Sequence, residues 1–325
     1  MKKYGLDLLD RKILFQLDLD SRQSYKALGK KLSVAKETIA FRIKRLKKTG
    51  YIKGFLTAIH VSNLNRYYYK LFYKFHKTTP AIDKQIVNFI KEYQGIAYFA
   101  SLEGRYDITF LVLSKTMTDL YNFLLPFREK FGDYILEQEI LTMPEGHRFN
   151  FRFFHDEDVF HQDRFQEQMQ EAKIDKTDYL IVKTLAENAR ISLIDLAKIT
   201  KRETNVVKYR LKKLKSQDIL GTHVLDINFE KFGLQHIQVC FTLKNHGVVA
   251  KLLSFASQMN QSTFATVTLG KYDLALEFVV EGSKELRLIL NKIKQKFSQD
   301  IIDHDVFILE EHLVNWFPYE MEKKS

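Results

Sequence analysis

The chain has 325 residues, 45% of them hydrophobic and 13% aromatic, which is enough to bury large cores and to form roughly two to four domains. This composition excludes a disordered chain, and the formal charge of +11 indicates a polyanionic partner such as nucleic acid. The single cysteine, Cys240, excludes an internal disulfide and favours a reducing compartment. The chain lacks an apolar run of about 18 residues and a signal-peptide core, so we expect a cytoplasmic protein that does not contact a membrane.

The first 60 residues predict a winged helix-turn-helix domain. Apolar residues at helical spacing predict helices over 6–19 and 24–31. Residues 33–48 form an amphipathic helix with a basic outer face and Ser33 as the expected N-cap. Alternation after residue 50 predicts a β-hairpin. The basic helix fits a DNA major groove, although a solvated lysine face is the simpler interpretation of one such helix.

Residues 61–145 predict a second kind of domain. Strands are expected at 67–75, 96–102, 106–113 and 134–143, with helices at 80–93 and 116–131. The aromatic residues and lysines that alternate in 67–75 could stack on bases, but packing within a sheet is the favoured interpretation. The order β-α-β-β-α-β is typical of a ferredoxin-like domain.

The segment that follows interrupts the pattern. An extra strand is expected at 149–154, an acidic turn at 156–158 and a polar helix at 159–172. We interpret residues 146–173 as a connector.

The basic module then recurs at a constant offset of 168 residues, a register too long to arise by chance. Capping boxes Ser192–Asp195 and Thr200–Glu203 are expected to start its second and third helices. Residues 1–60 have a net charge of +10 and residues 173–232 a net charge of +5. The matched pairs are Asp10 and Asp178, Ile13 and Ile181, Leu17 and Leu185, Arg22 and Arg190, Ser24 and Ser192, Leu28 and Leu196, Phe41 and Tyr209, Arg42 and Arg210, Ile43 and Leu211, and Leu46 and Leu214.

The ferredoxin-like half recurs as well, since the Gly-x-Tyr-Asp run at 104–107 is repeated at 270–273. The expected fold is α+β, with winged helix-turn-helix domains alternating with ferredoxin-like domains. The expected divisions are 1–60, 61–145, the connector 146–173, 174–230 and 231–325.

The sequence resembles the Lrp/AsnC family of transcription regulators. The resemblance rests on residues 9–14 (LDRKIL), 32–34 (LSV), 38–46 (TIAFRIKRL), 50–54 (GYIKG) and the Gly-x-Tyr-Asp run. Members of this family carry one DNA-binding and one ligand-sensing domain per chain and pair through the latter. The resemblance therefore implies a covalent pseudo-dimer that binds double-stranded DNA and assembles into a higher homo-oligomer.

The resemblance also implies which residues contact DNA. Arg42 and Arg210 could contact phosphate or guanine, or could instead form ion pairs with the first helix of each module. The copies differ, for example in Thr38 against Val206 and Lys48 against Ser216, which predicts an operator with unequal half-sites. The expected DNA-binding residues are Lys36, Thr38, Phe41, Arg42, Lys44, Arg45, Lys48, Val206, Tyr209, Arg210, Lys212 and Lys213.

An amino-acid effector is implied beside the two Gly-x-Tyr-Asp loops. A glycine there exposes backbone N–H groups to a carboxylate, and an aspartate could receive an amino group. A tight β-turn explains the same residues equally well. Glu103 and Leu269 depart from the family pattern before each glycine. The expected effector-binding residues are Gly104, Tyr106, Asp107, Gly270, Tyr272 and Asp273.

Two other functions compete with regulation. Sirohaem decarboxylases resemble this family in fold, but their His-Asn-Tyr segment is absent from the equivalent stretches 97–101 (AYFAS) and 264–268 (FATVT). The ten histidines form no metal-binding motif, so we expect no catalytic residue, metal or cofactor. An effector-independent architectural DNA-binding protein would carry the same basic helices, and sequence preference for one DNA site would distinguish the two.

Overall fold

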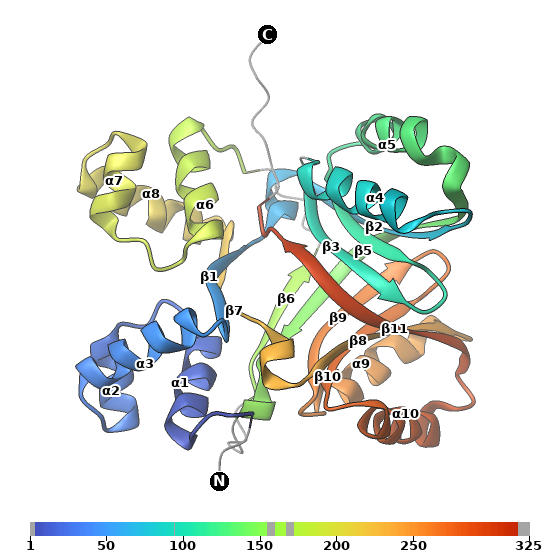
Figure 1. Cartoon of the computed structure of the whole chain (residues 1–325). Helices are drawn as coiled ribbons and strands as arrows, with labels where there is room; N and C mark the ends of the chain where they lie inside the picture. Colours follow the sequence, from blue (N-terminus) through green and yellow to red (C-terminus); the bar gives the residue numbers. More distant parts are fainter. Residues whose placement is uncertain (1–3, 94, 155–159, 167–171, 318–325) are drawn as a thin grey trace.

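The structure is a computed structural model that describes residues 4–93, 95–154, 160–166 and 172–317. Figure 1 shows two helical units on one side of the molecule and a β-barrel with helices on its outer surface on the other side. This mixed arrangement is the expected α+β fold. None of the helices in the described ranges is long and apolar enough to cross a membrane.

The first helical unit contains three helices, of which the first two are capped by side chains at their starts. Asp7 and Ser24 accept hydrogen bonds from backbone N–H groups in the first turns of α1 and α2. The expected N-cap at Ser33 is wrong. Ser33 ends α2 in the left-handed conformation (φ 57°), and α3 begins after Ala35 without a side-chain cap. The helices are α1 (Leu8–Leu19), α2 (Tyr25–Leu32) and α3 (Lys36–Lys48).

The second helical unit repeats this arrangement. Ser192 caps the second helix through the N–H of Asp195, as expected. The capping box at Thr200 is wrong, because Thr200 is the last residue of that helix and its hydroxyl donates to the carbonyl of Leu196 at 2.8 Å. The helices are α6 (Lys176–Glu187), α7 (Leu193–Thr200) and α8 (Thr204–Ser216).

The expected β-hairpin wing is also wrong. A single strand follows each helical unit, β1 (Ile52–Ile59) and β7 (Leu220–Ile227), and these two strands pair with each other in an antiparallel sheet. Reciprocal bonds at equivalent positions reinforce the pairing: the N–H of Ser21 donates to the carbonyl of His223, and that of Ala189 donates to the carbonyl of Phe55. The wings therefore join the two units to each other.

The barrel is built from two ferredoxin-like sheets. Each sheet has the order fourth, first, third, second strand, and the two sheets join at both edges through β3–β11 and β5–β9. The first half contains β2 (Tyr67–Phe75), α4 (Pro80–Glu92), β3 (Ile96–Glu103), β4 (Ile108–Ser114), α5 (Met117–Phe131) and β5 (Ile135–Phe149). The second contains β8 (Gln235–Leu243), α9 (Val249–Ser257), β9 (Ser262–Leu269), β10 (Leu274–Val280), α10 (Ser283–Phe297) and β11 (Ile301–Val314).

The connector differs from its prediction. The strand expected at 149–154 is instead the end of β5 and a 3₁₀ turn, Arg152–Phe154. The helix expected at 159–172 is wrong within the described residues, because Gln162–Gln166 forms strand β6, which pairs with β5. The acidic turn expected at 156–158 lies outside the described residues.

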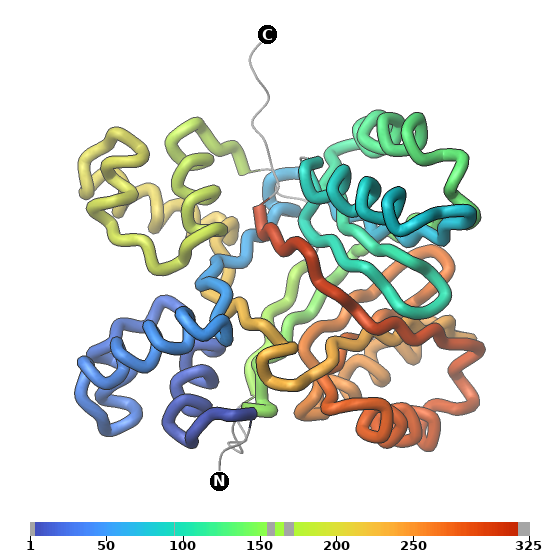
Figure 2. The backbone as a smooth tube through the Cα atoms, in the orientation of Figure 1, coloured from blue at the N-terminus to red at the C-terminus, as the bar shows by residue number. Residues whose placement is uncertain are grey.

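The two halves cross in space. In Figure 2, each helical unit lies diagonally opposite the ferredoxin-like unit of its own half and next to that of the other half. The hydrophobic core of the first helical unit accordingly includes Phe232, Leu234 and Val279, whereas that of the second includes Val61 and Leu64. Each helical unit therefore packs against residues of the opposite half of the chain.

Candidate DNA-binding surface

Helix α3 divides into a buried side and an exposed side. Ile39, Ile43 and Leu46 are buried at helical spacing and pack with α1 and α2. A short turn joins α2 to α3, as in helix-turn-helix proteins whose second helix enters the major groove. The remaining face of α3 is the candidate DNA-reading surface.

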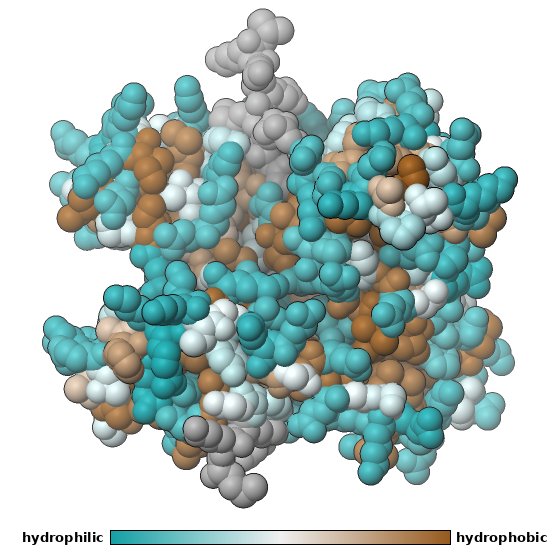
Figure 3. Space-filling view, viewed as in Figure 1, coloured by the Kyte–Doolittle hydropathy of each residue, from teal (hydrophilic) through white to brown (hydrophobic). Residues whose placement is uncertain are grey.

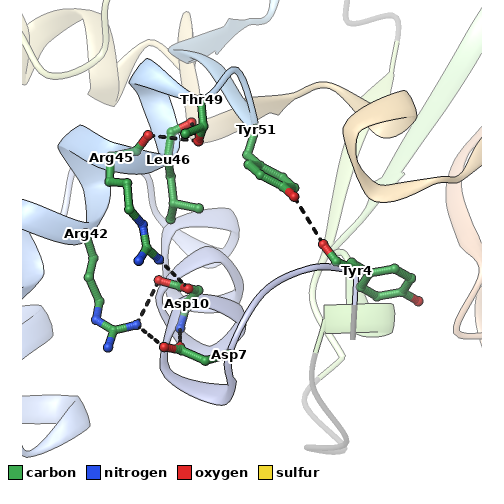
Figure 4. Close-up of polar contacts among 8 residues, drawn as sticks. All are labelled: Tyr4, Asp7, Asp10, Arg42, Arg45, Leu46, Thr49 and Tyr51. Carbon is green, nitrogen blue, oxygen red and sulfur yellow. Dashed lines mark hydrogen bonds and ion pairs between the residues drawn. The ribbon is translucent and has the colours of Figure 1, made fainter. Parts of the chain in front are cut away.

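The two arginines of α3 are tied to α1 (Figure 4). Arg42 Nη1 lies 2.5 Å from Asp7 Oδ2 and 3.0 Å from Asp10 Oδ1, and Arg45 Nη2 lies 2.5 Å from Asp10 Oδ2. Asp10 is almost fully buried. The pKa of Asp7 is below its ordinary value: burial raises it, but the hydrogen bonds and charge of Arg42 outweigh burial. These ion pairs fix the angle of α3 against α1.

The same arrangement recurs in the second unit. Arg210 Nη1 lies 2.6 Å from Asp175 Oδ2 and 2.8 Å from Asp178 Oδ1. Lys213 takes the place of Arg45, and its ammonium lies 3.5 Å from Asp178 Oδ2. The alternative considered for Arg42 and Arg210, an ion pair with the first helix, is what the structure contains at both positions.

Other expected DNA-binding residues point outward. The Phe41 side chain is 67% exposed and that of Tyr209 is 68% exposed, at equivalent positions of α3 and α8. Both rings therefore lie on the outer face of their helices, where the sequence predicts that they contact DNA. Lys36, Lys44, Lys48, Val206 and Lys212 are also exposed, while Thr38 is partly buried.

Three basic residues near α8 were missed by the sequence prediction. Lys201 and Arg202, in the turn before α8, and Lys208 on the helix are all exposed. Their counterparts at the 168-residue offset are Ser33, Val34 and Ala40. A comparison of the copies at unmatched positions would have found them. Lys201 and Arg202 add positive charge just before the start of α8, and Lys208 adds positive charge on the helix itself.

The two reading surfaces belong to separate lobes. Figure 3 shows the helical units as two projections with a hollow between them and hydrophilic residues along much of their outline. Reciprocal hydrogen bonds connect the two helical units where they meet. Arg190 donates to the carbonyl oxygen of Ser21 at 2.6 Å, and Arg22 donates to the carbonyl oxygen of Ile191 at 3.4 Å. The spacing of α3 and α8 is thus fixed by the protein itself.

The tyrosines of the Gly-x-Tyr-Asp loops lie inside the barrel. Tyr106 and Tyr272 are almost fully buried. Tyr106 Oη donates to Glu137 at 2.9 Å, and Tyr272 Oη donates to Asp305 at 2.5 Å. Their rings are part of the barrel core with Phe72.

The aspartates of these loops are bound to neighbouring backbone. Asp107 accepts from the N–H of Phe75 at 2.7 Å and from Lys74 Nζ at 2.6 Å. Asp273 accepts from the N–H of Leu243 at 2.6 Å. The glycines have positive φ values, 149° at Gly104 and 137° at Gly270. The structure therefore contains the tight-turn arrangement at both loops.

Comparison with known proteins supports the DNA-binding interpretation. A family model described as winged helix-turn-helix DNA-binding matches residues 6–53 and 174–220. The HTH-type transcriptional regulator Ptr1 of Methanocaldococcus jannaschii is 30% identical over 119 residues, 37% of this chain and 79% of Ptr1. An uncharacterised HTH-type transcriptional regulator of Pyrococcus horikoshii is 30% identical over 142 residues, 43% of this chain and 89% of that protein.

A solved structure matches the duplicated fold as a whole. The siroheme decarboxylase NirDL superposes with a TM-score of 0.64 over 96% of this chain and 94% of its own, at 12% sequence identity. At that identity the likeness describes the fold alone. The sequence relatives, by contrast, are transcriptional regulators that match at the level of residues. The chain belongs to the Lrp/AsnC family of HTH-type transcriptional regulators, with two regulator units in one polypeptide.

Proposed function

We propose that the protein regulates transcription by binding double-stranded DNA through α3 and α8, which read two unequal half-sites. This proposal rests on the two recognition helices, each of which is oriented by an ion pair with a buried aspartate. Each helix also has an exposed aromatic ring and exposed lysines on its outer face. Two helices fixed to one another suit half-sites about one helical turn apart, roughly 34 Å.

The inequality of the half-sites rests on differences between the two surfaces. On α3, Lys44 and Lys48 lie four residues apart and so share one face, whereas Ser216 replaces the second lysine on α8. The second unit instead carries its extra charge in the turn before α8, at Lys201 and Arg202. The two helices therefore offer different contacts to phosphates and bases.

Charge reversal on each helix tests this proposal. We expect Lys44→Glu to weaken binding to a specific site by about tenfold or more, because it also places a carboxylate beside Lys48, and Lys212→Glu to weaken it less. Neither lysine has an ion-pair partner among the described residues, so the fold should be unaffected. Gel-shift titration against DNA from upstream of its own gene, at several salt concentrations, measures both effects.

Exposed Lys84 on α4 provides the matched control, since Lys84→Glu changes the net charge equally but lies on the outer surface of the barrel. Equal losses from Lys44→Glu and Lys212→Glu, or a palindromic footprint with equal protection, would contradict unequal half-sites. An architectural protein would show a specific affinity close to its non-specific affinity, whereas a regulator should exceed it by about 10³ or more.

We also propose that a small molecule modulates DNA binding. The amino-acid effector implied by the family resemblance was expected at the Gly-x-Tyr-Asp loops. At these loops, Asp107 and Asp273 already accept hydrogen bonds from backbone N–H groups, and the side chains of Tyr106 and Tyr272 are buried. A ligand at these loops would have to compete with the hydrogen bonds that hold the loops in place. We therefore propose that the effector binds at a different site of the molecule.

We propose that the chain has no decarboxylase activity, although its fold resembles that of NirDL. Another NirDL structure contains an iron-uroporphyrin III analogue, a polycarboxylate. The present chain lacks the His-Asn-Tyr segment typical of these decarboxylases, and the equivalent stretches 97–101 (AYFAS) and 264–268 (FATVT) contain no histidine. An absorption titration with iron uroporphyrin tests this point. A stoichiometric spectral shift followed by loss of carboxylate would contradict it.

A further inference from the structure

A cavity of about 240 Å³ lies between the β1–β7 sheet and the barrel. Residues of both wings and of both barrel halves line it, including Leu56 of β1, Leu225 of β7, Lys70 of β2 and Glu277 of β10. This volume is slightly below the usual range for small-molecule sites, roughly 300–1,000 Å³, and suits one small organic ligand. The cavity is distinct from the DNA-reading surface and from the Gly-x-Tyr-Asp loops.

Aromatic rings form much of the cavity wall. Phe165 of β6 stacks against Trp316 with ring centroids 5.5 Å apart and against Phe264 at 6.3 Å. Tyr98 and Phe229 complete this aromatic lining. Flat faces of this kind favour a planar ligand, which gains stacking contacts as well as burial.

The charges of the lining balance one another. Arg66, Lys70 and Arg148 face the cavity together with Asp226, Glu277 and Glu311. Glu311 lies 2.8 Å from Lys53, which also exerts its field on Asp226, and Arg148 is paired with buried aspartates. Because three positive and three negative side chains line the cavity, the lining has no excess charge to compensate a charged ligand for its lost hydration, so an uncharged ligand is favoured.

The central carboxylate, Glu277, is satisfied within the protein. It accepts from Gln238 Nε2 at 2.7 Å and from His236 Nε2 at 3.2 Å, and Lys70 Nζ lies 3.9 Å away. Although burial raises the pKa of Glu277, these neighbours hold it below its ordinary value. The carboxylate is thus ionised and can only accept, so His236 Nε2 carries the proton.

Two polar atoms of cavity residues are buried without a hydrogen-bond partner among the described residues. They are the hydroxyl of Tyr98 and Nδ1 of His236. Burial raises the pKa of Tyr98 well above its ordinary value, so its hydroxyl stays protonated and can donate. In the neutral imidazole with its proton on Nε2, His236 Nδ1 is an acceptor. A buried polar group without a partner costs about 1–3 kcal/mol, so a ligand that pairs with both atoms would recover part of that cost.

We propose that this cavity binds an uncharged planar aromatic molecule carrying both a hydrogen-bond acceptor and a donor, such as an aromatic amide or a nucleobase-like heterocycle. Its acceptor meets the Tyr98 hydroxyl and its donor meets His236 Nδ1, while its ring packs on the aromatic wall. Because β1 and β7 line the cavity, a bound ligand contacts the strands that join the two helical units. Its regulatory role rests on the proposed DNA-binding function.

Trp316 is the only tryptophan of the chain and lines the cavity, so its fluorescence reports binding directly. The intact protein is titrated, without DNA, with benzamide, benzoate, benzylamine and toluene, which share a ring and differ in charge and hydrogen bonding. We expect benzamide to bind about tenfold or more tightly than either charged analogue. Benzoate or benzylamine binding as tightly as benzamide, or no saturable fluorescence change with benzamide, overturns the proposal.

A Tyr98→Phe variant separates a ligand contact from a structural role. Removal of a hydroxyl without a partner should leave the unfolding midpoint unchanged or higher. Phe264 occupies the equivalent position of the second half, so the fold accommodates phenylalanine there. Benzamide binding should weaken about three- to tenfold, the value of one hydrogen bond. Tyr73→Phe is the matched control, because its buried hydroxyl also lacks a partner among the described residues but lies in the core between the first sheet and helices α4 and α5.

A gel-shift titration with and without saturating benzamide then tests the regulatory role. We expect benzamide to change the DNA affinity of the wild-type protein and to have less effect on Tyr98→Phe. Failure to bind DNA at all would contradict the proposed function but not the fluorescence result. Benzamide binding with unchanged DNA affinity overturns the regulatory role, and equal benzamide affinity in wild type and Tyr98→Phe overturns the assigned contact.

Discussion

Asp10 and Asp178 perform the same task at equivalent positions of the two copies. Each is almost fully buried and accepts charge-assisted hydrogen bonds from the arginine at the centre of its recognition helix. The arginines expected to read DNA therefore also orient the helices. Among the expected contacts, Lys44 and Lys212 are exposed without an ion-pair partner in the described part of the chain, which makes them the sharper tests of DNA binding.

Asp226 on β7 gives a prediction of pH dependence. Burial raises its pKa to about 6, against the field of Lys53. The native state therefore binds more protons than the unfolded state, and stability falls as pH rises from about 4 to about 6. We expect Asp226→Asn to raise the free energy of unfolding by about 1–3 kcal/mol near pH 8, and the gain to shrink toward pH 4.

Urea unfolding at several pH values measures the Asp226 effect. Asp133→Asn serves as the control, because Asp133 is exposed after α5 and its replacement should not alter the shape of the pH profile. A gain for Asp226→Asn that is the same at every pH would argue against titration of a buried carboxyl.

At the scale of the elements, the Gly-x-Tyr-Asp loops lie where one half of the barrel meets the other half. A Cβ on Gly104 would lie 2.7 Å from the carbonyl oxygen of Val306, and one on Gly270 would lie 2.5 Å from a methyl of Leu141. Each glycine thus permits a loop of one half to approach a strand of the other half. The repeated motif is explained by closure of the barrel as well as by turn geometry.

The close approach of Gly104 to Val306 can be tested by adding a single methyl group at residue 104. Gly104→Ala combines a φ of 149° with a backbone clash, so we expect a loss of at least about 1–3 kcal/mol in the free energy of unfolding. Gly132→Ala is the control, because no atom lies within 4 Å of its Cβ and its φ is −54°. Denaturant midpoints compare the two. Similar denaturant midpoints for the two variants would contradict a steric clash between residue 104 and Val306.

The elements also show what the sequence could predict. Helix and strand periodicity located most elements, because these patterns are local, and the repeat at offset 168 predicted the duplication. Pairing between distant strands has no such local signal. The joining of β1 to β7 was therefore missed, although each strand alone was expected. The cavity was missed for the same reason, since Tyr98 and His236 meet only through the barrel.

At the scale of the whole molecule, the two halves of the chain cross, and the helical units with the candidate DNA-binding surface therefore pack against the barrel. Each helical unit packs on the opposite half, and the wings pair with each other above the cavity. The two reading helices cannot move apart without disturbing β1–β7 or the reciprocal bonds of Arg22 and Arg190. A ligand beneath these strands is well placed to act on both helices at once.

The two helical units are not held in the same way, because among the described residues a buried arginine of its own half ties only the first unit to the barrel. Arg148 of β5 pairs with Asp18 of α1 and lies 3.4 Å from Asp163 of β6, while the positions equivalent to Arg148 and Asp18 in the second half are Val314 and Ala186. Arg148→Met leaves two buried carboxylates without this partner. We expect a loss of about 3–5 kcal/mol in the free energy of unfolding.

Chemical denaturation measures the effect of Arg148→Met, with Arg128→Met on α5 as the control, since Arg128 is exposed and Gln138 is its only hydrogen-bond partner among the described residues. Adding Asp18→Asn to Arg148→Met should recover part of the loss, because the second change removes one of the uncompensated charges. A recovery supports an ion pair that anchors the first unit to the barrel. A loss no larger than that of Arg128→Met would instead mean that apolar packing alone holds α1 in place.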